Sequence, residues 1–180
     1  MIDWSFIGSL EGERLSGYVP DTEGSKSGVT IAGGVDLSAW NRDMLAPLDS
    51  DLVDRLAPYF GLRGDDAIAA LRARPLSITQ AEADALDQFV HADALRRLGG
   101  DYFAATMKRF DQLPDVAQTV IASVAFQYGK LSKACPKFWA CAVRQDWAMM
   151  QQELEHFGDR YPTRRKKEAA YLGALLGDAA

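Results

Sequence analysis

The sequence has 180 residues, of which 48% are hydrophobic and 25% are charged, and its formal net charge is −5. A chain of this length can bury a core without disulfides. The acidic balance argues against a nucleic-acid-binding protein, which normally presents a basic face. No apolar stretch approaches the length of a bilayer span, so we expect no membrane insertion.

The N-terminus has no basic residues before its apolar part, unlike a signal peptide, so we expect synthesis in the cytoplasm. His91 and His156 lie far apart in the sequence without ligand-spaced partners. We therefore expect no metal site and no cofactor. Cys135 and Cys141 match neither a CxxC redox pair nor a zinc framework. We expect them to be reduced thiols that fill space.

Helical spacing of apolar residues predicts a short helix over residues 2–12 that stops near Glu11, where a carboxyl is half shielded from water. Two short strands are predicted at residues 14–20 and 28–35, joined by turn formers. The stretch 10–37 is dense in carboxylates and hydroxyls set among glycines: Glu11, Glu13, Asp21, Thr22, Glu23, Thr30 and Asp36. This pattern fits a hairpin that lines a cleft, and it also fits a polar surface hairpin.

From residue 50 onward the pattern is helical. Thr79 and Glu82 form a capping box that opens a helix expected to end at Gly99–Gly100. Pro114 opens a strongly apolar helix that Gly129 ends, and this is the predicted core helix. The other predicted helices cover residues 50–59, 65–74, 102–110, 136–143 and 145–157, with a last one capped by Thr163.

Many helices after one hairpin indicate a mainly helical α+β protein with the sheet segregated to one end. We expect one domain over residues 1–180, with a small hairpin lobe at about 1–60 and a helical lobe at about 61–180.

Five segments in order resemble the lysozyme-like killing domain of pesticin and its relatives, and more distantly the phage-type lysozymes. They are Glu11–Pro20 with Tyr18, Ser27–Leu37, Ala125–Gly129, Phe138-Trp139 with Asp146-Trp147, and Phe157–Tyr161 before Arg164–Ala169. The resemblance runs from residue 10 to about residue 172 and implies a lysozyme-like fold around a central apolar helix.

The resemblance implies a muramidase that cleaves the β-1,4 bond between N-acetylmuramic acid and N-acetylglucosamine in peptidoglycan. Glu11 would be the general acid, and Thr30 would help to hold the attacking water, which implies inversion. Two residues are candidates for the second catalytic carboxylate. Asp36 fits the pesticin pattern and is favoured, while Asp21 fits the phage-lysozyme pattern.

The resemblance also implies substrate contacts by Gln127, Tyr128 and Tyr18, and a pairing of Arg164 with Glu11. From the residues alone, Gln127 could cap its own helix and Tyr128 could be core. The run Arg164–Lys167 reads as a solvated face, or as a basic patch that attracts an anionic wall polymer.

Three functions fit these features: a muramidase, a lytic transglycosylase that needs only the acid, and a wall-binding module without activity. The muramidase accounts best for the set Glu11, Thr30 and Asp36. It implies a monomer that acts on peptidoglycan in the cell wall, either as a phage endolysin or as a delivered toxin for which an immunity protein could exist.

Overall fold

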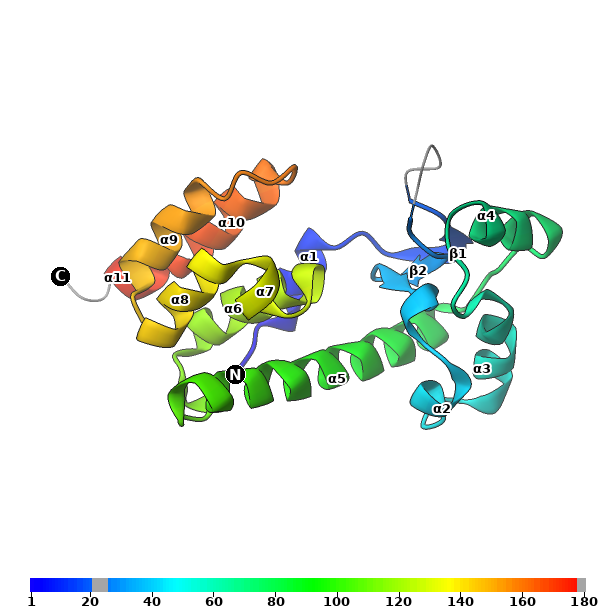
Figure 1. The fold of residues 1–180 in the computed structure, drawn as a ribbon, viewed down its shortest axis with the longest axis horizontal. Helices are drawn as coiled ribbons and strands as arrows, with labels where there is room; N and C mark the ends of the chain where they lie inside the picture. The colour runs from blue at the N-terminus through cyan, green and yellow to red at the C-terminus, as the bar shows by residue number, and fades with distance from the viewer. Residues whose placement is uncertain (21–25, 178–180) are drawn as a thin grey trace. The chain divides into compact units, whose positions relative to one another are not determined.

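The structure is a computed structural model that describes residues 1–20 and 26–177 (Figure 1). By its internal contacts the chain divides into two compact units. One unit is Glu11–His91, and the other combines Met1–Leu10 with Ala92–Ala180. Helices dominate and the strands form one small antiparallel sheet, which confirms the predicted mainly helical α+β class.

The sheet belongs to the unit Glu11–His91 and contains β1 (Arg14–Tyr18), β2 (Thr30–Ala32) and β3 (Val35–Asp36) in that order. The prediction of one strand over residues 28–35 is wrong. The chain reverses between β2 and β3, because Gly34 adopts a left-handed φ of 97° that suits a tight turn. The resulting register pairs Thr30 with Asp36 and Ile31 with Val35.

Three helices pack around the sheet: α2 (Arg42–Leu45), α3 (Ser50–Leu56) and α4 (Gly64–Ala73). Leu52, Leu56 and Ala67 from these helices share one buried cluster with Ile31 of β2. The predicted lobe boundary near residue 60 therefore lies inside this unit. The apolar faces of α3 and α4 need the sheet as their partner, so the division falls after His91 instead.

Helix α5 (Gln80–Thr106) begins in one unit and ends in the other. Its start confirms the capping box, since Glu82 Oε2 accepts from Thr79 N at 2.8 Å and Thr79 Oγ1 accepts from Glu82 N at 3.3 Å. The prediction that Gly99–Gly100 ends this helix is wrong. Both glycines lie within the helix, and the buried side chains of Leu98 and Tyr102 anchor it on either side of them.

The remaining helices belong to the unit Met1–Leu10 with Ala92–Ala180. They are α1 (Trp4–Leu10), α6 (Asp115–Tyr128), α7 (Leu131–Ala134), α8 (Pro136–Arg144), α9 (Trp147–Glu155), α10 (Pro162–Leu172) and α11 (Ala174–Gly177). Helix α6 is buried from Ala117 to Ala125, and Gly129 ends it with a φ of 71°. The predicted core helix is thus confirmed. Thr163 does not cap α10, because the helix already begins at Pro162.

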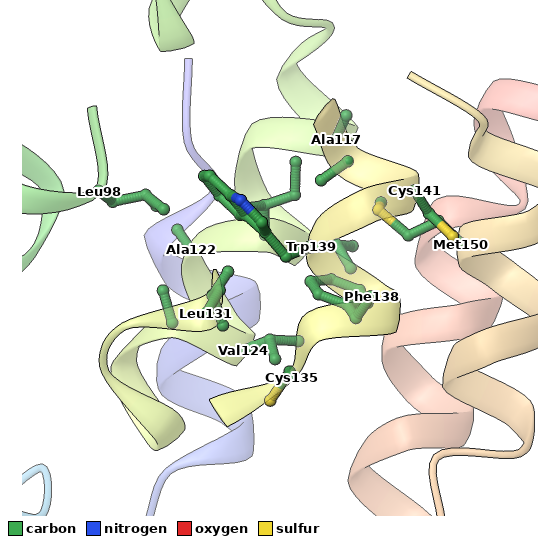
Figure 2. Close-up of a cluster of buried hydrophobic side chains, with 14 of the residues drawn as sticks. Leu98, Ala117, Ala122, Val124, Leu131, Cys135, Phe138, Trp139, Cys141 and Met150 are labelled. Carbon is green, nitrogen blue, oxygen red and sulfur yellow. The ribbon is translucent and has the colours of Figure 1, made fainter. Parts of the chain in front are cut away.

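The core of this unit gathers around α8, where Phe138 is fully buried (Figure 2). Val124 of α6, Leu131 of α7 and Met150 of α9 join the same cluster. Cys135 and Cys141 are free, and burial raises the pKa of both thiols. Among the described helices, none combines the length and the apolar character needed to cross a membrane.

Candidate active site

Glu11 directly follows helix α1 in the sequence and belongs to the sheet-containing unit. Its side chain is only 14% exposed, so the carboxyl is largely shielded, as the sequence predicts. One ionisable neighbour is His91 of α5, whose Nε2 lies 3.6 Å from Glu11 Oε2. A shielded carboxyl beside an ionisable ring is a suitable place for a proton-donating group.

Three predicted site residues occupy one row across the sheet. Tyr18 of β1 pairs with Thr30 of β2, and Thr30 pairs with Asp36 of β3. Directly paired residues of antiparallel strands present their side chains on the same face of a sheet. The register therefore brings together Tyr18, Thr30 and Asp36, which lie up to 18 residues apart in the sequence (36 − 18 = 18).

Backbone N–H groups fix the Asp36 carboxylate. Its Oδ1 accepts from Ser38 N at 2.9 Å and its Oδ2 accepts from Gly28 N at 3.3 Å. The first bond makes Asp36 the N-cap of the short 3-10 helix Leu37–Ala39. Asp36 is preferred as the cap because it can satisfy the Ser38 backbone N–H itself.

Gly28 is the residue that allows Asp36 to come this close to the backbone. A Cβ at position 28 would lie 2.4 Å from Asp36 Oδ1 and 2.9 Å from the carbonyl oxygen of Leu62. The hydroxyl of Thr30, which is 4% exposed, donates to the Gly28 carbonyl oxygen at 3.4 Å. Gly28, Thr30 and Asp36 thus form one closely fitted group at the start of β2 and the end of β3.

Tyr18 is half-buried, and the Arg14 guanidinium lies 4.3 Å from the centre of its ring. This stacking holds the ring in place while leaving part of it accessible. Asp21, the alternative second carboxylate, lies outside the described residues.

Sequence reasoning missed Asp87, a half-buried carboxylate on α5. Both of its oxygens accept from the backbone N–H of Gly33 at 3.0 Å. Burial raises the pKa of Asp87, against the opposing effect of the Gly33 hydrogen bond. The charges of His91, Glu11 and Glu13 also act on it. The available signal was the four-residue spacing of Asp87 and His91, which puts both on one face of a helix.

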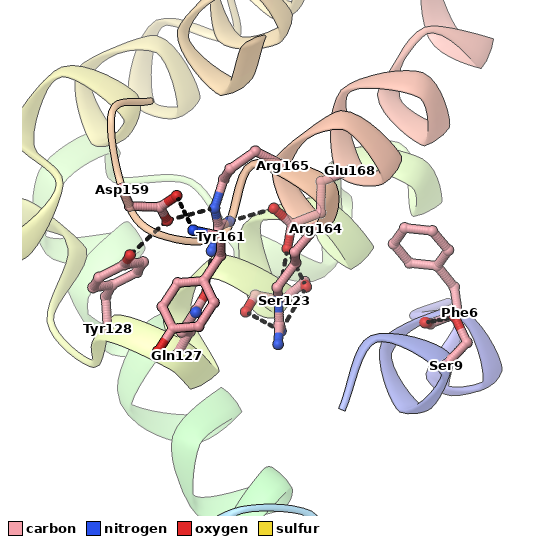
Figure 3. Close-up of polar contacts among 10 residues, drawn as sticks. All are labelled: Phe6, Ser9, Ser123, Gln127, Tyr128, Asp159, Tyr161, Arg164, Arg165 and Glu168. Carbon is pink, nitrogen blue, oxygen red and sulfur yellow. Dashed lines mark hydrogen bonds and ion pairs between the residues drawn. The ribbon is translucent and has the colours of Figure 1, made fainter. Parts of the chain in front are cut away.

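Gln127 and Tyr128, at the end of α6, are bound into a buried polar network in the other unit (Figure 3). Tyr128 donates to Asp159 Oδ2 at 2.6 Å, and the side-chain oxygen of Gln127 accepts from the Arg165 guanidinium. Burial, followed by the hydrogen bond to Asp159, raises the pKa of Tyr128 to about 12. Both side chains are therefore held in defined orientations, and their contact with sugar remains a prediction.

Arg165 is the centre of this network although it carries a charge. It is 2% exposed, donates from Nε to Asp159 at 2.9 Å, and lies 4.7 Å from the centre of the Phe157 ring. It also pairs with Glu168 of its own helix. Burial acts to raise the pKa of Asp159, but the hydrogen bonds from Tyr128, Tyr161 and Arg165 together outweigh it and lower that pKa.

Arg164 pairs with Glu168 at 3.2 Å and donates to the Ser123 hydroxyl and carbonyl oxygens, each at 3.1 Å. Burial raises the pKa of the fully buried Glu168 above its ordinary value, although both arginines act in the opposite direction. The predicted partner of Arg164, Glu11, belongs to the other unit, so that pairing stays a prediction. Lys166 and Lys167 are exposed, and the interpretation of the basic run as a solvated face is wrong for Arg165.

Within residues 1–20 and 26–177, no cluster of three or more His, Cys, Asp or Glu side chains is arranged to hold a metal ion. The residues that the geometry brings together at the sheet are instead carboxylates, a hydroxyl and an imidazole. These groups can transfer protons and place a water molecule.

Comparison with known families gives one result that decides the relationship. The model of the Pesticin family, described as a bacterial toxin homologue of phage lysozyme, C-term, matches residues 1–148. The chain belongs to the pesticin family. No curated protein matches it.

Membership of the pesticin family confirms the lysozyme-like α+β fold and supports a peptidoglycan hydrolase of the muramidase type. The matched region includes the whole sheet-containing unit and helix α6. It ends before α10, so Arg164, Arg165 and Glu168 lie beyond the part that the pesticin family describes.

Proposed function

We propose that this pesticin-family protein hydrolyses the β-1,4 bond between N-acetylmuramic acid and N-acetylglucosamine in peptidoglycan. The observation that carries the proposal is the register that pairs Thr30 with Asp36, in the same unit as the shielded Glu11. A polar surface hairpin kept for solubility does not require Thr30 to be buried or Asp36 to be fixed by two backbone N–H groups.

Glycoside hydrolysis needs one carboxyl that gives a proton to the leaving oxygen and one ionised carboxylate that acts on the other face of the sugar ring. The two carboxyls must have different surroundings. Glu11 is shielded and lies beside His91, whereas Asp36 is oriented by the backbone N–H groups of Gly28 and Ser38. We assign Glu11 as the general acid and Asp36 as the general base.

Thr30 is assigned to hold the attacking water. Its hydroxyl donates to the Gly28 carbonyl, so its oxygen is oriented and can accept a hydrogen bond from water. Direct attack by water inverts the anomeric carbon. Tyr18, Gln127 and Tyr128 are assigned to sugar contacts, and Arg164 to the support of Glu11.

The substrate lies in the cell wall, so the protein must reach it either as a phage endolysin or as a delivered toxin. We propose that it acts there as a monomer. The two routes are distinguished by neighbouring genes, since a holin gene indicates a phage and a gene for a small exported partner indicates a toxin with an immunity protein.

The proposal is tested by the release of reducing ends from purified peptidoglycan. Wild type is expected to release them, and Glu11→Gln to be slower by about 10²–10⁴-fold, the usual contribution of a general acid. Glu13→Gln is the matched control, because Glu13 is a nearby exposed carboxylate. No release by wild type would overturn the proposal. Anhydro-sugar ends in the mass spectra of the products would indicate a lytic transglycosylase instead.

A further inference from the structure

Asp87 and His91 lie one helical turn apart on α5, in the part of that helix that belongs to the sheet-containing unit. Residues four apart on a helix are neighbours on one face. That face meets two segments that carry the proposed catalytic groups. Asp87 contacts the turn between β2 and β3, and His91 contacts the segment that begins at Glu11.

Asp87 holds the turn that joins the strands of Thr30 and Asp36. Both carboxylate oxygens accept from Gly33 N at 3.0 Å, and a Cβ at position 33 would lie 2.8 Å from Asp87 Oδ2. The glycine backbone and the carboxylate therefore fit closely. Through this contact the face of α5 that carries His91 is fixed relative to the sheet.

His91 Nε2 lies 3.6 Å from Glu11 Oε2, within ion-pair range. Their side chains are 21% and 14% exposed, so water screens the interaction only in part. The charged groups of this unit that act on Asp87 are Glu11 and Glu13 from the segment after α1, and His91 from α5 itself. An imidazole amid carboxylates is attracted to them when it is protonated.

We infer that His91 is a positioning residue, which holds the Glu11 carboxyl in the orientation from which it donates its proton. The inference rests on the proposed role of Glu11 as general acid. Without the imidazole, one contact that orients the carboxyl toward the leaving oxygen is lost.

The contact between His91 and Glu11 is tested without activity by NMR of the histidine rings in the protein without substrate. His91 and His156 are the only histidines in the sequence, so assignment needs one variant, His156→Gln. Glu11→Gln is expected to shift the ring resonances of His91, because the carboxyl 3.6 Å from its Nε2 is replaced by an amide. The ring resonances of His156, which belongs to the other unit, serve as the control and are expected not to move. Unchanged His91 resonances would overturn the inference.

The positioning role is tested by steady-state kinetics on soluble glycan strands. A displaced acid costs rate more than binding, so His91→Gln is expected to lower kcat by about 10-fold or more and to leave KM within about twofold. His156→Gln is the control and is expected to match wild type.

The two proposals fail in different ways. If Glu11→Gln is inactive while His91→Gln keeps the kcat of wild type, the role of His91 is refuted and the muramidase stands. If Glu11→Gln is as active as wild type, the assignment of Glu11 itself is wrong. Should His91→Gln fold poorly, the NMR comparison decides, because it leaves His91 unchanged.

Discussion

Glu11 lies beside an imidazole and near a half-buried carboxyl, whereas Asp36 is held by the backbone N–H groups of Gly28 and Ser38. These surroundings differ in kind, and a pair of carboxyls with different tasks needs such a difference. The sequence located Glu11, Thr30 and Asp36 through a resemblance. It could not show that Thr30 is buried or that Asp36 caps Leu37–Ala39, because both follow from the pairing of β2 with β3.

The choice between Asp36 and Asp21 is made by paired substitutions. Asp36→Asn is expected to lower the rate of reducing-end release by roughly 10²–10⁴-fold, because an amide cannot act as a base. Asp21→Asn is expected to have a smaller effect. Asparagine is also a good N-cap, so Asp36→Asn is expected to change the melting temperature little. The reverse order of the two activities would assign the base to Asp21.

At the scale of elements, the sequence predicted the features that depend on neighbouring residues, but it did not predict contacts between residues far apart in the chain. The capping box of Thr79 and Glu82 and the C-terminal Gly129 of α6 are confirmed, because each acts within one helical turn. The predicted helix end at Gly99–Gly100 is wrong, because packing of the flanking side chains keeps α5 helical through both glycines. Asp87 was missed because its partner Gly33 lies 54 residues away in the sequence.

The polar network between α6 and α10 predicts how the stability of the protein depends on pH. The pKa of Asp159 is lowered in the folded protein, so its contribution to stability is present above its ordinary value of 3.8 and is lost as the pH falls through the folded pKa. Asp159→Asn is expected to destabilise by roughly 1–3 kcal/mol at neutral pH, since it weakens charged hydrogen bonds to Tyr128 and Arg165. The difference is expected to vanish in strong acid.

Thermal unfolding as a function of pH measures this effect. Asp101→Asn is the control, because its ion pair with Lys130 is at 3.6 Å and more exposed, and such pairs contribute little. A loss of stability for Asp159→Asn that is equally large at pH 2 and pH 7 would contradict the proposed linkage, because the Asp159 carboxylate would not be its source.

At the scale of the whole molecule, two hydrophobic cores divide the chain. One contains the sheet with α2, α3 and α4, and the other surrounds α6 and α8. Predicted site residues fall in both units: Glu11, Thr30 and Asp36 in one, and Gln127, Tyr128 and Arg164 in the other. The sequence predicted a helical α+β fold correctly. The single domain with lobes that meet near residue 60 stays a prediction, and within the unit Glu11–His91 helices α3 and α4 share the core of the sheet.

The anomeric configuration of the first product tests the central claim most directly, since it reports whether water attacks the sugar itself. Soluble, uncross-linked glycan strands are treated with the protein, and the new N-acetylmuramic acid ends are followed by ¹H NMR before the anomers equilibrate. Hydrolysis assisted by Glu11, Thr30 and Asp36 predicts that the α-anomer appears first from the β-linked substrate. The β-anomer as the first product would contradict the account, because it would indicate two successive displacements and not direct attack by water.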